Sequence, residues 1–277
     1  ALGTYVFFMI AIPPCSTLLR SPPLLGSTAP GGLAGLTALA ARLSDAALQV
    51  PDTDWHLERL YAFARELGAS VLVATHSRYV IDLNRPPDGS SLYPGQNVTG
   101  LCPVDTFDET PLYPRGDVPD DAEIAARRTA IWQPYHQQLR AELDRLRAQH
   151  GVAVLWDAHS IRSVLPRFFE GQLPDFNLGT ADGASCAPAL EQALLPIAEA
   201  APGYTAVLNG RFKGGHITRH YGEPARNIHA VQLELTWRCY MDEVAPYTYL
   251  QGRAAQVQPH LRRMLETALG FARGAAL

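Results

Sequence analysis

The sequence is poor in paired cysteines, long hydrophobic runs and charge of one sign. Its 277 residues include four cysteines, and none of them belongs to a CxxC pair. Scattered cysteines in a chain of this size are expected to be free thiols, which favours a cytoplasmic protein. The apolar stretch at 5–14 is too short to span a membrane and has no basic segment before it. We therefore expect a buried strand there and no signal peptide.

Charge is also scarce, and this limits the kinds of partner. Charged residues make up 18% of the chain, and the formal net charge is −4. This balance lacks the positive excess with which proteins bind nucleic acids or anionic membranes, so neither partner is expected. The sequence contains no GxxxxGKS/T phosphate loop and no GxSxG nucleophile elbow. A small molecule is the expected partner, and the oligomeric state stays open.

The hydrophobic pattern predicts strands that alternate with helices. Short apolar runs predict strands at 5–14, 70–74, 79–83, 152–156, 204–208 and 230–236. Helical spacing predicts helices at 33–48, 52–67, 120–149, 186–200 and 257–271. Hydrophobic residues make up 47% of the chain, enough for one large core. We expect a single α/β domain over 1–277, with a mainly parallel mixed sheet and helices on both faces.

Two features interrupt this regular pattern. Pro134 lies inside the predicted helix 120–149, where it should bend the helix. Residues 86–118 form a long segment rich in Pro, Gly and Asp, followed later by a second loop-rich stretch at 165–184. Loops of such length in compact domains are usually functional or disordered.

Polar residues cluster at two places in the first third of the chain. Asp52 and Asp54 begin the predicted helix 52–67, where one aspartate suffices as a cap. Capping and metal binding are therefore equal alternatives for this pair. Further on, Arg85 stands where a predicted strand enters a loop, and Arg78 precedes it. The planar guanidinium group can bind a carboxylate through two hydrogen bonds, and a surface salt bridge is the alternative.

A third cluster follows the predicted strand 152–156 and contains Asp157, His159 and Arg162. A histidine just past a buried strand is well placed to ligate zinc through one ring nitrogen. Asp157 can orient that ring from behind. A structural histidine is the alternative, although the flanking aspartate and arginine favour a functional role.

The fourth cluster lies within the predicted strand 230–236. Alternation of side chains puts Gln232 and Glu234 on one face and the apolar residues on the other. A glutamate in a buried strand is costly unless it is paired or functional. Glu234 is therefore a candidate general base acting on a metal-bound water, with a buried ion pair as the alternative.

Between these two clusters lies a basic, glycine-rich stretch at 209–222, with the sequence NGRFKGGHITRHYG. Its glycines allow the backbone to come close to a ligand, and Arg211 and Lys213 supply positive charge.

Seven ordered segments of the chain carry a family resemblance. They are PDTDWH at 51–56, SRYVIDLNRPPD at 77–88, SLYPGQNVTGLCP at 91–103, LWDAHSIRS at 155–163, LPDFNLGTADGASC at 173–186, NGRFKGGHITRHYG at 209–222 and QLEL at 232–235. Together they resemble the N-formylglutamate amidohydrolases, from about Pro51 almost to the end of the sequence. The resemblance implies a fold similar to zinc carboxypeptidases and aspartoacylase-like deacylases. It also implies hydrolysis of N-formyl-L-glutamate to formate and L-glutamate in histidine degradation.

The same resemblance implies roles for individual residues. His159 and Asp54 would ligate one zinc ion, and Glu234 would be the general base. Asn84 and Arg85 resemble the pair with which carboxypeptidases hold the α-carboxylate of their substrate. Candidates for the second substrate carboxylate are Arg78, Arg162, Arg211 and Lys213.

One position departs from the family pattern. Pro14 stands where the family usually has a zinc-binding histidine, and the segment before Pro51 diverges. Cys15 or His56 could replace the missing ligand, since thiolate and imidazole both suit zinc. Three functions therefore remain open: an active deformylase, a non-catalytic binding protein on the same scaffold, and a deacylase for another N-acyl amino acid.

Overall fold

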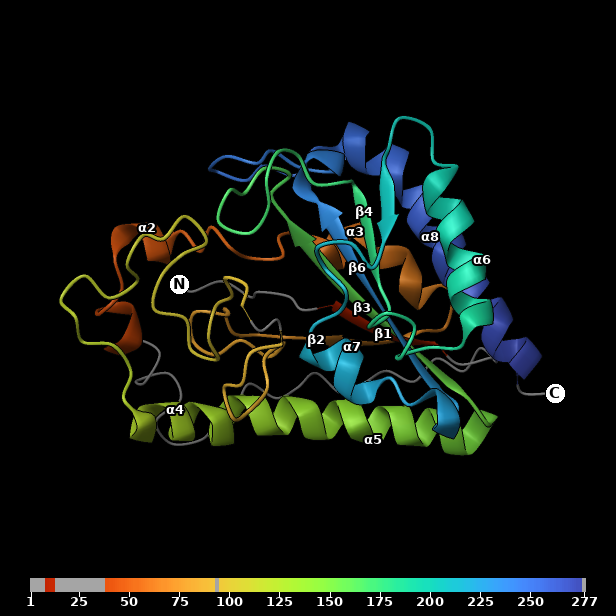
Figure 1. Cartoon of the computed structure of the whole chain (residues 1–277), viewed down its shortest axis with the longest axis horizontal. Helices are drawn as coiled ribbons and strands as arrows, with labels where there is room; N and C mark the ends of the chain where they lie inside the picture. Colours follow the sequence, from red (N-terminus) through yellow and green to blue (C-terminus); the bar gives the residue numbers. More distant parts are fainter. Residues whose placement is uncertain (1–7, 13–37, 93–94, 276–277) are drawn as a thin grey trace.

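The computed structural model describes residues 8–12, 38–92 and 95–275, and six strands in these ranges form one mixed sheet (Figure 1). The strands are β1 (Phe8–Ile12), β2 (Ser70–Val73), β3 (Ala153–Ile161), β4 (Phe176–Gly179), β5 (Ala206–Leu208) and β6 (Ile228–Thr236). Their order across the sheet is β2-β1-β3-β6-β4-β5. The two long strands, β3 and β6, therefore lie side by side in the middle.

The directions of the strands correct one expectation. The sheet is mixed as predicted, but β3–β6 and β4–β5 are its two parallel pairs, against three antiparallel ones. It is therefore not mainly parallel. The connection from β3 to β4 shows the reason, because it contains no crossover helix, and a parallel return usually needs one. β4 therefore runs opposite to β3 and β6.

Helices cover both faces of the sheet, as predicted. They are α2 (Asp45–Leu48), α3 (Leu57–Leu60), α4 (Asp121–Arg127), α5 (Gln133–His150), α6 (Pro188–Glu199), α7 (His216–Tyr221) and α8 (Gln251–Ala275). Figure 1 shows α5 and α7 on one side, and α6 and α8 on the other. Among the described helices, none combines the length and the apolar character needed to cross a bilayer. These elements form one α/β domain.

The two central strands divide their side chains between the two helical layers. On β3, Val154 and Trp156 belong to the core formed with α3, α6 and α8, whereas Ala153 and Leu155 pack in the core beneath α5 and α7. β6 alternates in the same way, with Val231, Leu233 and Leu235 on the α6–α8 side. The predicted alternation of 230–236 is thus confirmed. Toward the ends of both strands, the α5–α7 side becomes polar.

Several predicted elements differ from the structure. Residues 79–83 form turns instead of a strand, and the helix expected over 52–67 is reduced to α3 and the short 3-10 helix Ala62–Arg65. His56 precedes α3 with a positive φ of 61°, which a continuous helix cannot contain. The prediction missed β4 and α7. Of the helix expected at 33–48, residues 38–48 lie within the described residues, where 38–40 are helical, 41–42 form a turn and α2 follows.

The long helix is interrupted, although not by a sharp bend. α4 and α5 are joined by a π-turn at Arg128–Trp132, and Figure 1 shows the two helices nearly in line. Pro134 has no N–H to donate to the carbonyl of Ala130, so the regular bonding pattern must change at this point. In place of the bend predicted at Pro134, the structure therefore has a widened turn.

Candidate active site

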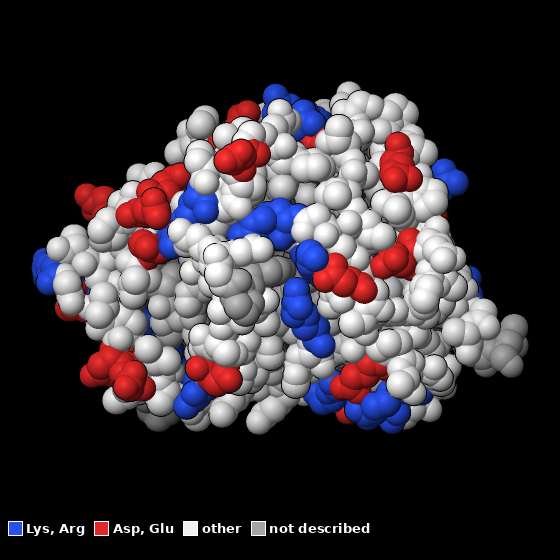
Figure 2. Space-filling model, viewed as in Figure 1, with Lys and Arg blue, Asp and Glu red and all other residues white. Residues whose placement is uncertain are grey.

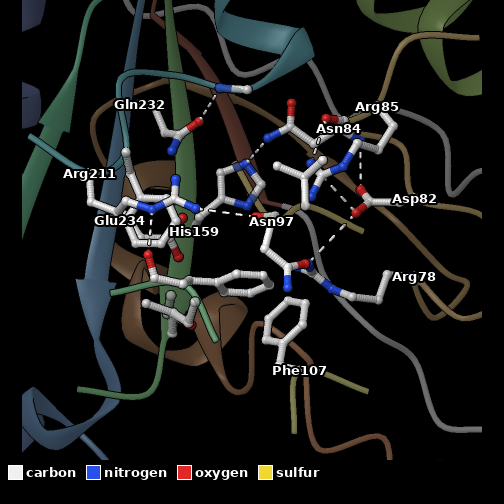
Figure 3. A pocket seen from close by; sticks show the side chains of 16 residues that line it. Arg78, Asp82, Asn84, Arg85, Asn97, Phe107, His159, Arg211, Gln232 and Glu234 are labelled. Atoms are coloured by element: carbon white, nitrogen blue, oxygen red, sulfur yellow. Dashed lines mark hydrogen bonds and ion pairs between the residues drawn. The ribbon is translucent and has the colours of Figure 1, made fainter. Parts of the chain in front are cut away.

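A pocket opens where the polar ends of β3 and β6 meet three loops (Figure 3). Its lining consists of Arg78, Asp82, Asn84, Arg85, Asn97, Val98, Phe107, His159, Ser160, Ile161, Phe168, Arg211, Phe212, Gly215, Gln232 and Glu234. Figure 3 shows His159 in the centre, with Gln232, Glu234 and Arg211 on one side and Asp82, Asn84 and Arg85 on the other. Three guanidinium groups therefore line a cavity that also has apolar walls.

His159 lies within β3 and is 3% exposed. Its Nε2 atom is 2.8 Å from Asp157 Oδ1 and 2.9 Å from Asn84 Nδ2, while its Nδ1 atom faces Asp54 Oδ2 at 3.6 Å. Burial by itself lowers the pKa of His159, but the carboxylates of Asp157 and Asp54 outweigh burial and raise this pKa well above the usual value. The ring is thus held between two carboxylates. Because β3 continues to Ile161, these residues lie in the strand itself and not after it.

Glu234 stands next to His159 across the sheet, because the two are register partners in the parallel pairing of β3 and β6. Its side chain is 8% exposed. Burial raises the pKa of Glu234 to about 8; His159 and Arg78 act to lower it, whereas Asp54 and Asp157 raise it further. This pKa lies near neutral pH, where a carboxyl group can both accept and return a proton.

Asp52 and Asp54 do not cap α3, whose N-cap residue is His56. Asp54 Oδ1 accepts a hydrogen bond from the backbone N–H of Ser160 at 2.5 Å, and Asp54 Oδ2 accepts one from Arg78 at 3.0 Å. The capping interpretation is therefore wrong for both aspartates. Asp54 is instead tied to β3, one residue beyond His159.

Asn84 and Arg85 both line the pocket, but their side-chain polar atoms also form hydrogen bonds within the protein. Asn84 Oδ1 accepts the backbone N–H of Ile217 at 2.8 Å, while its Nδ2 contacts His159. The Arg85 guanidinium donates to the carbonyl and hydroxyl of Thr99 at 2.9 and 3.0 Å. Asn84 therefore connects the pocket to the start of α7, and Arg85 connects it to Thr99, with a further bond from its Nη1 to the carbonyl of Asn84 at 3.1 Å.

The other predicted cations separate into two groups. Arg78 and Arg211 line the pocket, where Arg78 pairs with Asp54 and Arg211 donates to the carbonyl of Phe168 at 2.6 Å. Arg162 and Lys213 are not among the lining residues. Arg162 pairs with Asp108 at 2.8 Å and Lys213 with Asp182 at 2.9 Å. The structure thus places these two residues outside the pocket lining and beside aspartates.

Sequence reasoning assigned no role to four polar lining residues: Asp82, Asn97, Ser160 and Gln232. Gln232 had a visible signal, because it alternates with Glu234 on β6, and its Oε1 accepts the N–H of Gly215 at 2.7 Å. Asp82 fell inside a run interpreted as a strand. Asn97 lies in a loop without periodicity, so no pattern in the sequence marked it.

The spacing of the candidate ligand atoms can be compared with the spacing that a zinc ion requires. Two ligand atoms on a tetrahedral zinc, each about 2.0–2.2 Å away, lie roughly 3.4 Å from one another. The separation of 3.6 Å between His159 Nδ1 and Asp54 Oδ2 is close to this value. Asp157 on the opposite ring nitrogen is the usual partner of a ligating histidine. These two residues therefore fit a shared cation.

A third ligand is not found among the described residues, in which no three His, Cys, Asp or Glu side chains gather to hold a metal. His56 does not supply it, because its Nε2 contacts the carbonyl of Tyr247 at 2.7 Å and its ring packs against Trp55 and Tyr249. That replacement was a wrong expectation. Pro14 and Cys15 lie outside the described residues.

The fold and the site define an α/β protein whose polar pocket, lined with arginines at the ends of two central strands, suits a small anion. A family model described as N-formylglutamate amidohydrolase matches residues 17–241, so the chain belongs to the N-formylglutamate amidohydrolase family. It is 53% identical to the N-formylglutamate deformylase of Pseudomonas putida, over 90% of this chain and 93% of that protein. Its identity to the N-formylglutamate deformylase of Pseudomonas aeruginosa is 52%, over 91% of this chain and 94% of that protein.

Solved structures show the same fold. The N-formylglutamate amidohydrolase of Ralstonia eutropha JMP134 superposes with a TM-score of 0.66 at 24% identity, over 97% of this chain and 98% of that one. A gene product of Agrobacterium tumefaciens gives a TM-score of 0.61 at 21% identity, over 86% and 84% of the two chains. At these identities the likeness concerns the fold alone.

Proposed function

We propose that this chain is a metal-dependent amidohydrolase that hydrolyses N-formyl-L-glutamate to formate and L-glutamate. The observation that carries the proposal is the pairing of Glu234 with His159 across β3 and β6, in a pocket lined by three arginines. The names of the relatives, which share about half of their residues with this chain over most of its length, support the same substrate.

His159 and Asp54 would hold one zinc ion. When bound, the ion would act as a Lewis acid toward the formyl carbonyl group. Asp157 fixes the histidine ring by its contact with Nε2, which leaves Nδ1 directed at Asp54. Asp54 in turn keeps its place through the N–H of Ser160.

Glu234 is assigned the role of general base. It takes a proton from the water that attacks the formyl carbon, and it returns this proton to the amine nitrogen as the C–N bond breaks. The products are formate and the free amino group of glutamate. The pKa of about 8 that burial gives Glu234 suits both halves of this transfer near neutral pH.

The substrate carries two carboxylates, and the pocket offers cations on two sides. Arg85 lies on the Asn84 side and Arg211 on the Glu234 side, whereas Arg78 pairs with Asp54 at 3.0 Å. Arg78 and Arg85 also share Asp82, at 3.7 and 3.8 Å. We assign one carboxylate to Arg85 and the other to Arg211. Figure 2 shows Lys and Arg side chains gathered across the middle of one face of the molecule, which favours approach of an anion despite the net charge of −4.

We also place the activity in the cytoplasm. Among the described residues, Cys102, Cys186 and Cys239 are buried free thiols. This state suits a reducing compartment.

Formate release from N-formyl-L-glutamate by the purified protein, with its zinc content measured, tests the proposal. Glu234→Gln should lower kcat about 10²–10⁴-fold, because the base is lost while the shape of the side chain stays. Its melting temperature and zinc content should remain close to those of the wild type.

Failure of the zinc-loaded wild type to release formate would overturn the proposal. A melting temperature raised by N-formylglutamate without turnover would then identify a binding protein. Faster release of acetate or succinate from the corresponding N-acyl glutamates would identify a different deacylase.

A further inference from the structure

The loop at 80–87 brings Asp82, Asn84 and Arg85 into the pocket without any regular secondary structure. Buried carbonyl groups in such a loop need hydrogen-bond donors from elsewhere. Four of its carbonyls obtain them from side chains of the single helical stretch formed by α4, the π-turn and α5. The bonds are Arg127 to Val80 (2.8 Å), His136 to Leu83 (2.9 Å), Trp132 to Arg85 (3.1 Å) and Arg128 to Pro87 (2.9 Å).

The π-turn explains how one helix reaches so many points of the loop. Because its bonds join residues i and i+5, side chains five positions apart can share a face, in addition to those four apart. Arg127 and Arg128 can thus both lie on the same side as Trp132 and His136. A regular helix would turn one of the two arginines away from the loop.

Trp132 occupies the central place in this arrangement. It ends the π-turn and is 9% exposed, and its ring stacks on that of His136 with 3.6 Å between the ring centroids. It does not line the pocket, and its Nε1–H donates to the carbonyl of Arg85. His136 then continues the contact to α7 through the hydroxyl of Tyr221 at 2.8 Å.

We propose that the π-turn is a positioning device for substrate recognition, in which Trp132 fixes the backbone of Arg85 and thereby the direction of its guanidinium group. This inference rests on the proposed function, since it takes Arg85 as a ligand of a substrate carboxylate. Trp132 is a positioning residue, because it acts through Arg85 and does not touch the substrate.

Trp132→Phe tests the inference, because it keeps an aromatic ring beside His136 and removes the N–H donor. We expect KM for N-formylglutamate to rise at least about fivefold, with kcat within twofold of the wild type. Tyr135→Phe is the matched control on the same helix. The Tyr135 hydroxyl is buried without a hydrogen-bond partner among the described residues, so its removal should leave KM unchanged.

A double-mutant cycle with Arg85→Ala separates positioning from a structural defect. If Trp132 acts through Arg85, Trp132→Phe should raise KM in the wild type and leave it unchanged in the Arg85→Ala protein. An equal rise in both backgrounds, or no rise in the wild type, overturns the inference. Should Trp132→Phe fail to fold, Arg128→Ala removes the neighbouring bond to Pro87 from a half-buried side chain and enters the same cycle.

Hydrogen exchange distinguishes this inference from the proposed function. Amide exchange in peptides covering 80–87 should accelerate in Trp132→Phe and not in Tyr135→Phe, whether or not the protein turns over substrate. Unchanged exchange contradicts the positioning role. Absence of formate release by the wild type would overturn the proposed function and, with it, the place of the inference in substrate recognition.

Discussion

At the scale of single residues, Asp52 and Asp54 lie two positions apart in the sequence, but the fold gives their carboxylates different partners. Asp52 Oδ2 accepts hydrogen bonds from the Tyr79 hydroxyl at 2.5 Å and from the backbone N–H of Phe107 at 2.7 Å. It therefore fastens two loops to each other. Asp54, two residues on, faces His159 instead.

This difference predicts opposite outcomes for the same substitution. Asp54→Ala should lower the zinc content and reduce kcat/KM at least about 100-fold, because one ligand is lost. Asp52→Ala should keep zinc and lower the free energy of unfolding by about 1–3 kcal/mol, since it leaves the buried donors of Tyr79 and Phe107 without their acceptor. Metal analysis and urea unfolding of both variants check this. Equal zinc loss in the two variants would contradict it.

The sequence marked Asp54, His159 and Glu234 because each polar residue stands near an apolar strand or a helix start, where its burial has to be explained. It could not separate Asp54 from Asp52, since their partners come from residues 78–107 and 160. Nor could it place Arg162 and Lys213 outside the pocket lining, because a basic residue looks the same in sequence whether it meets a ligand or a neighbouring aspartate. Tertiary contacts made both distinctions.

At the scale of elements, periodicity predicted those parts whose hydrophobic side chains repeat. Helices α5, α6 and α8 and strands β3 and β6 lie where the pattern placed them, with shifts at their ends. The prediction of a strand at 79–83 failed because an apolar run such as Tyr-Val-Ile-Asp-Leu also suits a buried loop, provided that other elements donate hydrogen bonds to its carbonyl groups. Here α4 supplies the bond to Val80 and α5 the bond to Leu83, and no local pattern reveals that.

The start of α7 gives a prediction at this scale. Gly215 leaves no room for a Cβ atom, which would overlap the Asn84 side chain. Asn84 cannot easily withdraw, because it holds both Ile217 and His159. Gly215→Ala should therefore lower kcat/KM more than about tenfold and reduce the melting temperature.

Gly252→Ala is the matched control for this substitution. Gly252 lies in α8 with open space around its would-be Cβ atom, so alanine there should stabilise the protein by roughly 0.5–1 kcal/mol. Its activity should stay unchanged. Measurement of kcat/KM and of the melting temperature of the two variants tests this prediction. Wild-type activity in Gly215→Ala would disprove the close contact between Gly215 and the Asn84 side chain.

At the scale of the whole molecule, the layer formed by α5 and α7 encloses histidines that stay neutral. Burial lowers the pKa of His136 to about 3 and, together with His220, lowers that of His216 to about 4. The neutral His136 ring can donate from Nε2 to Leu83 and accept at Nδ1 from Tyr221. Its protonation would place a charge in a layer built around apolar residues such as Leu139 and Ile217.

These lowered pKa values predict how stability depends on pH. A histidine whose pKa is lower in the folded than in the unfolded state contributes stability that is complete above about pH 6.5 and is lost as the pH falls toward its folded pKa. For His136 this window extends from about 6.5 down to about 3, with a loss of about 1 kcal/mol between pH 6 and pH 5. His136→Gln keeps a side-chain donor for Leu83 but does not titrate. Urea unfolding at pH 7, 6 and 5 should therefore show a shallower decline for His136→Gln than for the wild type, and parallel declines would mean that His136 keeps its ordinary pKa in the folded protein.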